Sequence, residues 1–309
     1  MNGRPGFRRS RAIVLIITTA LLALPGVAGA HQFGDWGLAV IEPNVNSTVA
    51  DGCPIESPNG LELYLASNRD PIGGATDSND IYVARRASKD DDFGAAVRLP
   101  TPVNSTAADF CPTPLTGNRL LFVSARAIAG ACGAGDIYLT RNHPAKGWLT
   151  PTNLGCAATG AGPNSAGGEF SPSLVETAQG TMLFYSRPGA GGLQDVYVSQ
   201  MRSDGTFTVG TPVAELNTAG FNDQMPNVSR DGREIVFVSD RPGVGGLDVY
   251  VATRASTDQA WSAPVLLGSN VNTTAAESRP SLSADGQRLH FGRLGDIWVS
   301  ERVQLTGPR

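Results

Sequence analysis

Five acidic residues recur at one place in five copies of the same short pattern, acid-x-x-Pro. They are Asp51, Asp109, Glu169, Asp223 and Glu277. Carboxylates held close together repel one another unless they are paired, protonated or bound to a cation. Such a set could hold a structural cation, or it could supply the two carboxylates of unlike pKa that glycoside hydrolysis requires.

An arginine follows each acid after a short apolar stretch and could neutralise it. The five are Arg69, Arg126, Arg187, Arg241 and Arg293. The start of a first strand and the end of a second lie on the same face of a blade, so all ten side chains should surround one mouth of a central channel. Ion pairs that lock neighbouring loops are the first interpretation, because a residue present in every repeat is best explained by the fold. A binding site at the channel mouth is the second.

The acids and arginines flank strands of mainly apolar residues. The stretch that ends on the arginine reads LELYLASNR in the first copy and EIVFVSDR in the fourth. A third strand follows a Gly-rich gap and opens on an aspartate, which we expect to cap the turn. These aspartates, spaced 48 to 59 residues apart, are Asp80, Asp136, Asp195, Asp248 and Asp296.

A fourth element follows the third strand in four of the copies. The fifth copy lacks it, and residues 36–47 at the front of the chain match it in type and order. A four-stranded antiparallel sheet needs neighbours on both faces, and radial packing provides them. We therefore predict an all-β fold, a five-bladed β-propeller whose last blade is closed by an N-terminal strand. Its blades are about 51–104, 109–155, 169–217, 223–272, and 277–302 with 36–47.

Residues 1–30 have the composition of a secretory signal peptide. Four arginines precede an apolar run over 12–24, and Ala-Gly-Ala at 28–30 offers a cleavage site. We expect an exported protein, periplasmic or secreted, with one domain over 31–309 and no membrane span after processing. Cleavage would leave His31 at the N-terminus, where it could be the first ligand of a copper site in a less favoured alternative.

The charge balance argues against nucleic acid as a partner. The chain has 24 basic and 28 acidic residues, and loss of residues 1–30 removes four arginines and no acid. Nucleic-acid-binding proteins usually carry a basic excess. Since a closed propeller needs no second chain in order to fold, we expect a monomer.

The four cysteines are Cys53, Cys111, Cys132 and Cys156. An even number in an exported chain indicates disulfides, and the absence of a CxxC pair argues against a structural zinc site. Three pairings are open. We favour 53–111 with 132–156, because the first two occupy one repeat position in neighbouring blades and the last two lie in loops at one rim.

Residues that break the repeat are better candidates for a specific role than those that keep it. Besides Cys53 and Cys111 they are Phe110, Phe170, Phe221, Arg279 and His290. Each is more often a packing residue than a recognition residue. Concave mouths are nevertheless where ligands usually bind.

The string GREIVFVSDRPGVGGLDVYVA, preceded by DQMPNVSRD, resembles the TolB-type, WD-like β-propeller repeat. Residues 277–300 match it nearly as well, and the resemblance covers most of 36–302. It implies a periplasmic or secreted binding platform. TolB itself differs from this chain, since it has an additional N-terminal α/β domain and six blades.

The leading hypothesis is a non-catalytic binding module or scaffold for a protein or peptide. No nucleophile–base arrangement stands out, and His31, His143 and His290 are the only histidines, which leaves little room for a Ser-His-Asp triad. The alternative is a propeller that binds a polysaccharide or hydrolyses glycosides with its channel-mouth carboxylates. No cofactor is expected beyond a structural cation in the channel.

Overall fold

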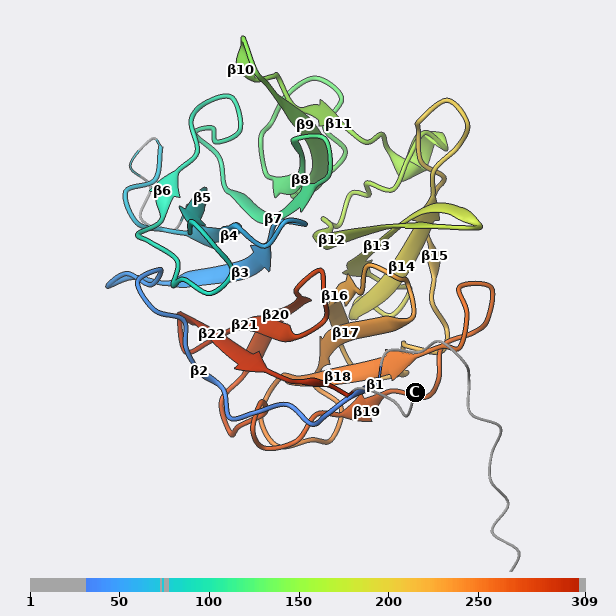
Figure 1. Ribbon diagram of the computed structural model, residues 1–309. Helices are drawn as coiled ribbons and strands as arrows, with labels where there is room; N and C mark the ends of the chain where they lie inside the picture. The colour runs from blue at the N-terminus through green and yellow to red at the C-terminus, as the bar shows by residue number, and fades with distance from the viewer. Residues whose placement is uncertain (1–31, 73, 75–77, 306–309) are drawn as a thin grey trace, which may run out of the picture. The chain divides into compact units, whose positions relative to one another are not determined.

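Five antiparallel sheets follow one another around a ring (Figure 1). The computed structural model describes residues 32–72, 74 and 78–305. Each sheet is one blade with four strands in sequence order, so the predicted five-bladed all-β propeller is confirmed. The predicted signal peptide, residues 1–30, and His31 lie outside the described residues.

The strands of each blade are numbered from the innermost outwards. Blade 1 has β3 (Asp51–Glu56), β4 (Glu62–Ser67), β5 (Asp80–Arg85) and β6 (Val97–Arg98). Blade 2 has β7 (Asp109–Leu115), β8 (Arg119–Ser124), β9 (Asp136–His143) and β11 (Thr152–Asn153), and β10 (Gly147–Trp148) extends β9 as a hairpin. Blade 3 has β12 (Phe170–Thr177), β13 (Gly180–Pro188), β14 (Gln194–Gln200) and β15 (Thr211–Pro212). Blade 4 has β16 (Asp223–Val228), β17 (Glu234–Ser239), β18 (Asp248–Thr253) and β19 (Val265–Leu266). Blade 5 has β20 (Glu277–Leu282), β21 (Arg288–Arg293), β22 (Asp296–Glu301) and β2 (Val40–Ile41).

The second strands are buried on both faces because each blade is covered by two neighbours. Side chains alternate between the two faces of a strand. In β4, Leu63 and Leu65 pack in a cluster with Ile297 of blade 5, while Tyr64 packs with Leu120 and the rest of the cluster shared with blade 2. The hydrophobic core is therefore divided among the interfaces between blades.

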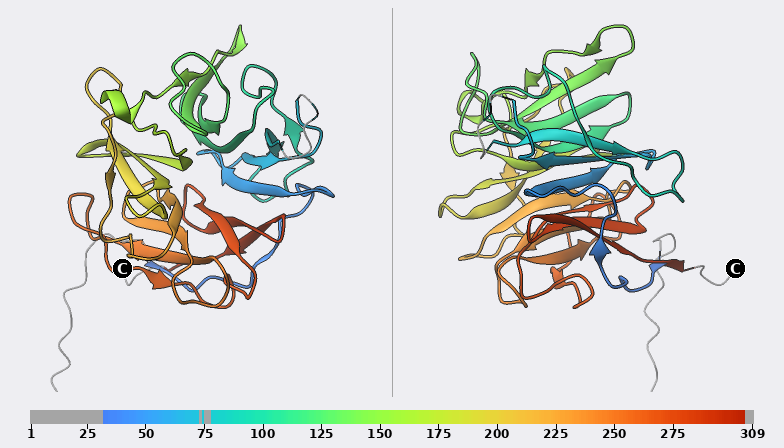
Figure 2. Two further views of the ribbon diagram at one scale, coloured as in Figure 1. Left: turned by 180° about the vertical axis from the view of Figure 1, so that it is seen from behind. Right: turned by 90° about the vertical axis from the view of Figure 1, so that its left-hand side faces the viewer.

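The N-terminal strand closes the ring, as predicted. Val40 of β2 pairs with Val299 of β22, and the Ser300 hydroxyl donates to the carbonyl of Gly37 (2.6 Å). Figure 2 shows this segment, in blue, beside the last blade, in red. A second pair that the sequence reading missed, β1 (Gln32–Phe33) with β23 (Gln304–Leu305), extends the closure.

The fourth strands are far shorter than the segments from which they were predicted. Each pairs over two residues only, and an asparagine side chain takes over beyond the ladder. Each such side chain exchanges two hydrogen bonds of 2.7–3.1 Å with the backbone of one third-strand residue. The asparagines are Asn46, Asn104, Asn164, Asn217 and Asn272.

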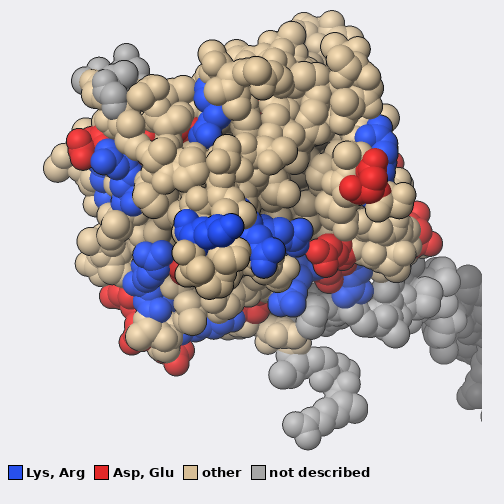
Figure 3. All heavy atoms as spheres, turned by 90° about the horizontal axis from the view of Figure 1, so that it is seen from above, with Lys and Arg blue, Asp and Glu red and all other residues tan. Residues whose placement is uncertain are grey.

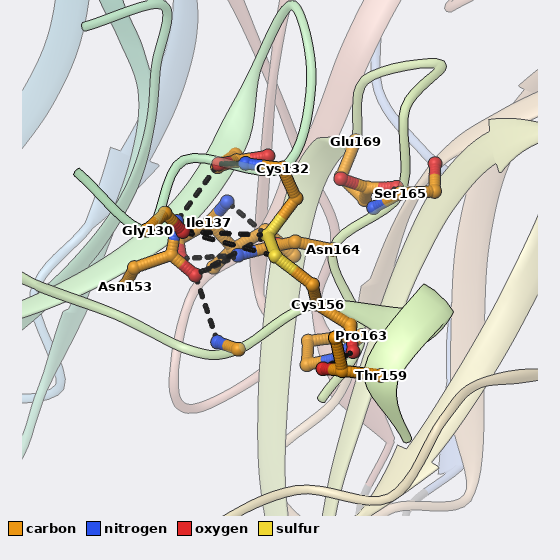
Figure 4. The surroundings of a disulfide bond; sticks show 12 residues. Gly130, Cys132, Ile137, Asn153, Cys156, Thr159, Pro163, Asn164, Ser165 and Glu169 are labelled. Carbon is orange, nitrogen blue, oxygen red and sulfur yellow. Dashed lines mark hydrogen bonds between the residues drawn. A yellow bond between two sulfur atoms is a disulfide. The ribbon is translucent and has the colours of Figure 1, made fainter. Parts of the chain in front are cut away.

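Two disulfides join the cysteines in the pairing that the sequence favoured. Cys53–Cys111 links the innermost strands β3 and β7. Cys132–Cys156 links the loop before β9 to the segment after β11 (Figure 4). Disulfides persist in oxidising compartments, so this pair of bridges is typical of an exported protein.

Charged side chains are spread unevenly over the surface. On the side drawn in Figure 3, Lys and Arg form a band with Asp and Glu near its edges, and other residues cover the rest. The formal net charge of the whole chain is nevertheless −4, so the band is local. In the part of the chain that the structure describes, no helix is long and apolar enough to cross a membrane.

Candidate functional site

The five repeated acids begin, or immediately precede, the innermost strands, and all are at least 97% buried. Each accepts a hydrogen bond from the Ser or Thr that follows the asparagine described above. The backbone N–H of Ser105, for example, donates to Asp109 (2.6 Å), and that of Ser165 donates to Glu169 (2.8 Å). Each acid therefore fixes the loop that connects one blade to the next.

Four of the five acids also pair with the arginine of their own blade. The Asp109 carboxylate lies 2.7 Å from Arg126 and that of Glu277 lies 3.7 Å from Arg293, and the pairs Asp51–Arg69 and Asp223–Arg241 are equivalent. The predicted grouping of acids and arginines at one end of the channel is therefore observed.

The arginines are held in turn by the aromatic residue of the third strand. Each guanidinium carbon lies 3.8–5.3 Å from the centre of such a ring, a cation–π geometry. The rings belong to Tyr82, Tyr138, Tyr197, Tyr250 and Trp298. These contacts give the ten residues a structural role, and a role in ligand binding stays a prediction.

Glu169 is the exception among the five acids. Among the ion pairs of the described residues none joins it to Arg187, which donates instead to the carbonyls of Pro163 (3.2 Å) and Gly210 (3.5 Å). Its Oε2 atom is buried without a hydrogen-bond partner. Burial raises the pKa of Glu169 to about 7, despite the hydrogen bonds from Ser165. Figure 4 shows Glu169 and Ser165 in the surroundings of the Cys132–Cys156 disulfide.

A second ring of residues lies two positions after the acids, where each innermost strand has a bulge. These residues have φ between 43° and 56°, a region that non-glycine residues seldom adopt. They are Cys53, Cys111, Ser171, Met225 and Arg279. The first two form the disulfide, the Ser171 hydroxyl lies 3.5 Å from the sulfur of Cys111, and the Arg279 N–H lies 3.3 Å from the sulfur of Met225.

Arg279 crosses the channel. Its backbone belongs to β20 of blade 5, and its Nη2 donates to the hydroxyl of Thr113 (3.1 Å) and the carbonyl of Pro172 (3.3 Å), on β7 and β12. Its side chain is completely buried. One side chain therefore bridges blade 5 to blades 2 and 3 on the far side of the ring.

A cavity of about 270 Å³ opens at the end of the channel away from the acids. The last residues of all five innermost strands line it, and they provide an apolar wall. The wall includes Ile55, Leu115, Val175, Val228 and Leu282. Thr113, the partner of Arg279, also lines the cavity, whereas none of the ten repeated acids and arginines does. We call this cavity the hairpin-side pocket, because the turns between first and second strands surround it.

Charged residues stand at the rim of the hairpin-side pocket. Arg119 lies 3.7 Å from Glu176, and Arg230 is exposed beside them. A third carboxylate, Glu56, is buried and is held by Arg288 (2.9 Å) and Arg86 (3.4 Å). The pocket thus combines an apolar wall with a mixed-charge rim.

The remaining candidates from the sequence have packing or closing contacts. Phe110 and Phe170 pack with ring centres 5.9 Å apart, and Phe221 is half-buried. His290 is buried and its Nε2 lies 2.9 Å from Glu42, on the segment that closes the ring.

Three of the third-strand aspartates cap turns as expected. Asp80, Asp136 and Asp248 each accept a backbone N–H from the preceding loop at 2.7–2.9 Å. In the described ranges, no group of three or more His, Cys, Asp or Glu residues is placed to hold a metal ion.

No protein-family model matches the sequence, and no curated protein matches it. Solved structures with a similar fold include two glycosidases. One is the catalytic domain of an α-L-arabinofuranosidase of family GH62 from Coprinopsis cinerea, with a TM-score of 0.57 and 13% identity over 88% of this chain and 97% of that one. The other is an endo-arabinase from Bacteroides thetaiotaomicron, with a TM-score of 0.52 and 16% identity over 89% and 99%.

A putative TolB from Agrobacterium tumefaciens is also similar. Its TM-score is 0.46, with 17% identity over 85% of this chain and 78% of that one, which is too weak to carry an argument. Identities this low show a shared propeller fold alone, and a fold does not determine a function. The sequence resemblance to TolB-type repeats is therefore supported only at the level of the fold.

Proposed function

We propose that this chain is an exported, non-catalytic propeller that binds a protein or peptide partner in its hairpin-side pocket. The observation that carries the proposal is the contrast between the two channel ends. The acids at one end are buried, and four of them are already paired with arginine, whereas the other end presents an open apolar wall with a charged rim. Apolar concavities with a few polar groups are the usual places for recognition.

Site-specific photo-crosslinking tests this proposal. A photoreactive residue replaces Thr116, which is exposed at the pocket, and the matched control replaces Val97, which is exposed on β6. We expect the Thr116 probe to capture a partner from the envelope or secreted fraction, and Leu115→Asp to abolish that capture. Equal capture by both probes would refute the pocket as the binding site.

Carbohydrate binding or glycoside hydrolysis is the second candidate, because the fold is shared with arabinofuranosidase and endo-arabinase structures. The carboxylates at the pocket are Glu56, which two arginines hold, and the exposed Glu176. A hydrolase would release reducing sugar from arabinan and would lose that activity in Glu176→Gln. We expect no release from the wild-type protein.

A further inference from the structure

Arg279 is a buried charge without a counter-charge. It is completely buried, and among the ion pairs of the described residues none includes it. Its Nη2 has two partners, the oxygens of Thr113 and Pro172, but Nε and Nη1 have none. The side chains next to it in the bulge ring, those of Met225 and the Cys53–Cys111 disulfide among them, are neutral.

The other buried arginines of the molecule are neutralised. Arg293 lies 3.7 Å from Glu277, and Arg86 lies 3.4 Å from Glu56. Burial lowers the pKa of Arg279 to about 9, which still leaves the guanidinium charged at neutral pH. An uncompensated buried ion is strongly destabilising, so a charge of opposite sign is expected beside it.

The hairpin-side pocket gives a route from solvent to this position. Thr113 lines the pocket and its hydroxyl accepts a hydrogen bond from the guanidinium, so Arg279 lies directly beneath the pocket floor. The group that reaches it must be small, since the side chain is sealed from solvent-sized contact. A single guanidinium with two unused donors matches an anion of one charge.

We propose that Arg279 binds a small monovalent anion of the halide class in the centre of the propeller, at its Nε and Nη1 atoms. The anion neutralises the channel and fixes the side chain that bridges blade 5 to blades 2 and 3. This site is separate from partner binding and would exist in the protein alone.

Bromide is the direct probe. Crystals of the processed protein grown in sodium bromide are expected to show an anomalous peak in contact with Nε or Nη1 of Arg279. A water molecule at that position, with no anomalous signal, would overturn the proposal. This readout uses the wild-type protein and does not depend on the folding of a variant.

Thermal unfolding gives the second readout. At constant ionic strength, replacing gluconate by chloride should raise the Tm of the wild-type protein by about 5 °C, with saturation, because a ligand of the folded state stabilises it. Arg279→Met should lose this response, and Arg230→Met at the pocket rim should keep it. An unchanged chloride response in Arg279→Met would contradict the assignment.

Discussion

The two ends of the central channel are built on opposite principles. At one end the same acid, backbone donor, arginine and aromatic residue recur around the ring, with one deviation at Glu169. At the other end every blade contributes a different set of residues to the hairpin-side pocket, and Arg279 of blade 5 has no counterpart in the other blades. Repetition marks what the fold needs, and the departures from it mark where a specific function can reside.

If the repeated end serves stability, removing one of its acids should have the largest effect. Asp109→Ala leaves Arg126 without its partner and the N–H of Ser105 without an acceptor. We expect a loss of about 3 to 5 kcal/mol in the free energy of unfolding, measured with urea. Asp90→Ala, at an exposed position, is the control. A loss below about 1 kcal/mol for Asp109→Ala would mean that the ring of acids is not structural.

The two disulfides should differ in the stability that they provide. Cys53–Cys111 spans 58 residues and Cys132–Cys156 spans 24, so the first constrains the unfolded chain more. The chain-entropy relation gives about 4 kcal/mol for the first and about 3.5 kcal/mol for the second. Chemical denaturation of the two double Cys→Ala variants measures the difference. The reverse order would show that strain or local packing outweighs chain entropy.

The exception among the acids should give the protein a distinctive pH dependence. The pKa of Glu169 is raised from 4.5 to about 7, so the folded state holds the proton more tightly than the unfolded chain. Its contribution is complete below pH 4.5 and is lost as pH rises through about 7, by roughly 3 kcal/mol.

Unfolding free energies at pH 5 and pH 8 test this effect. Glu169→Gln should flatten the slope, and Glu176→Gln, which is exposed, should leave it unchanged. A wild-type slope that persists in Glu169→Gln would assign the pH dependence to other groups.

The smallest stability effect is expected at the rim of the hairpin-side pocket. The Arg119–Glu176 pair is exposed, and such pairs contribute less than about 1 kcal/mol. Arg119→Ala should therefore leave the melting temperature nearly unchanged while it weakens crosslinking from Thr116. Loss of stability without loss of crosslinking would reverse the contrast between the two ends.

Much of the fold could be predicted because the repeat itself carries the information. The number of blades, the return of residues 36–47 to blade 5 and the disulfide pairing all follow from aligning equivalent positions. The turn-capping aspartates and the grouping of acids with arginines follow in the same way.

The remaining features depend on distances that a repeat does not encode. Nothing in the sequence shows that Asn164, displaced by a long loop, replaces the ladder in blade 2. Bulges at Cys53 and Arg279 have positive φ without glycine, so the usual signal is missing. The reach of Arg279 to Thr113 spans 166 residues of chain, and the pocket lies at the end opposite to the one that the acids suggested.

Ring closure also has a consequence for how the chain folds. Asn46 bonds to Ile297, a partner 251 residues later, so these contacts form only after the whole propeller has been made. Contacts between such distant segments slow folding, and in larger chains incomplete states expose unpaired strand edges that aggregate. The first blade-forming strand of this chain is thus the last to reach its place, and until it does β22 presents an open edge to any neighbouring chain.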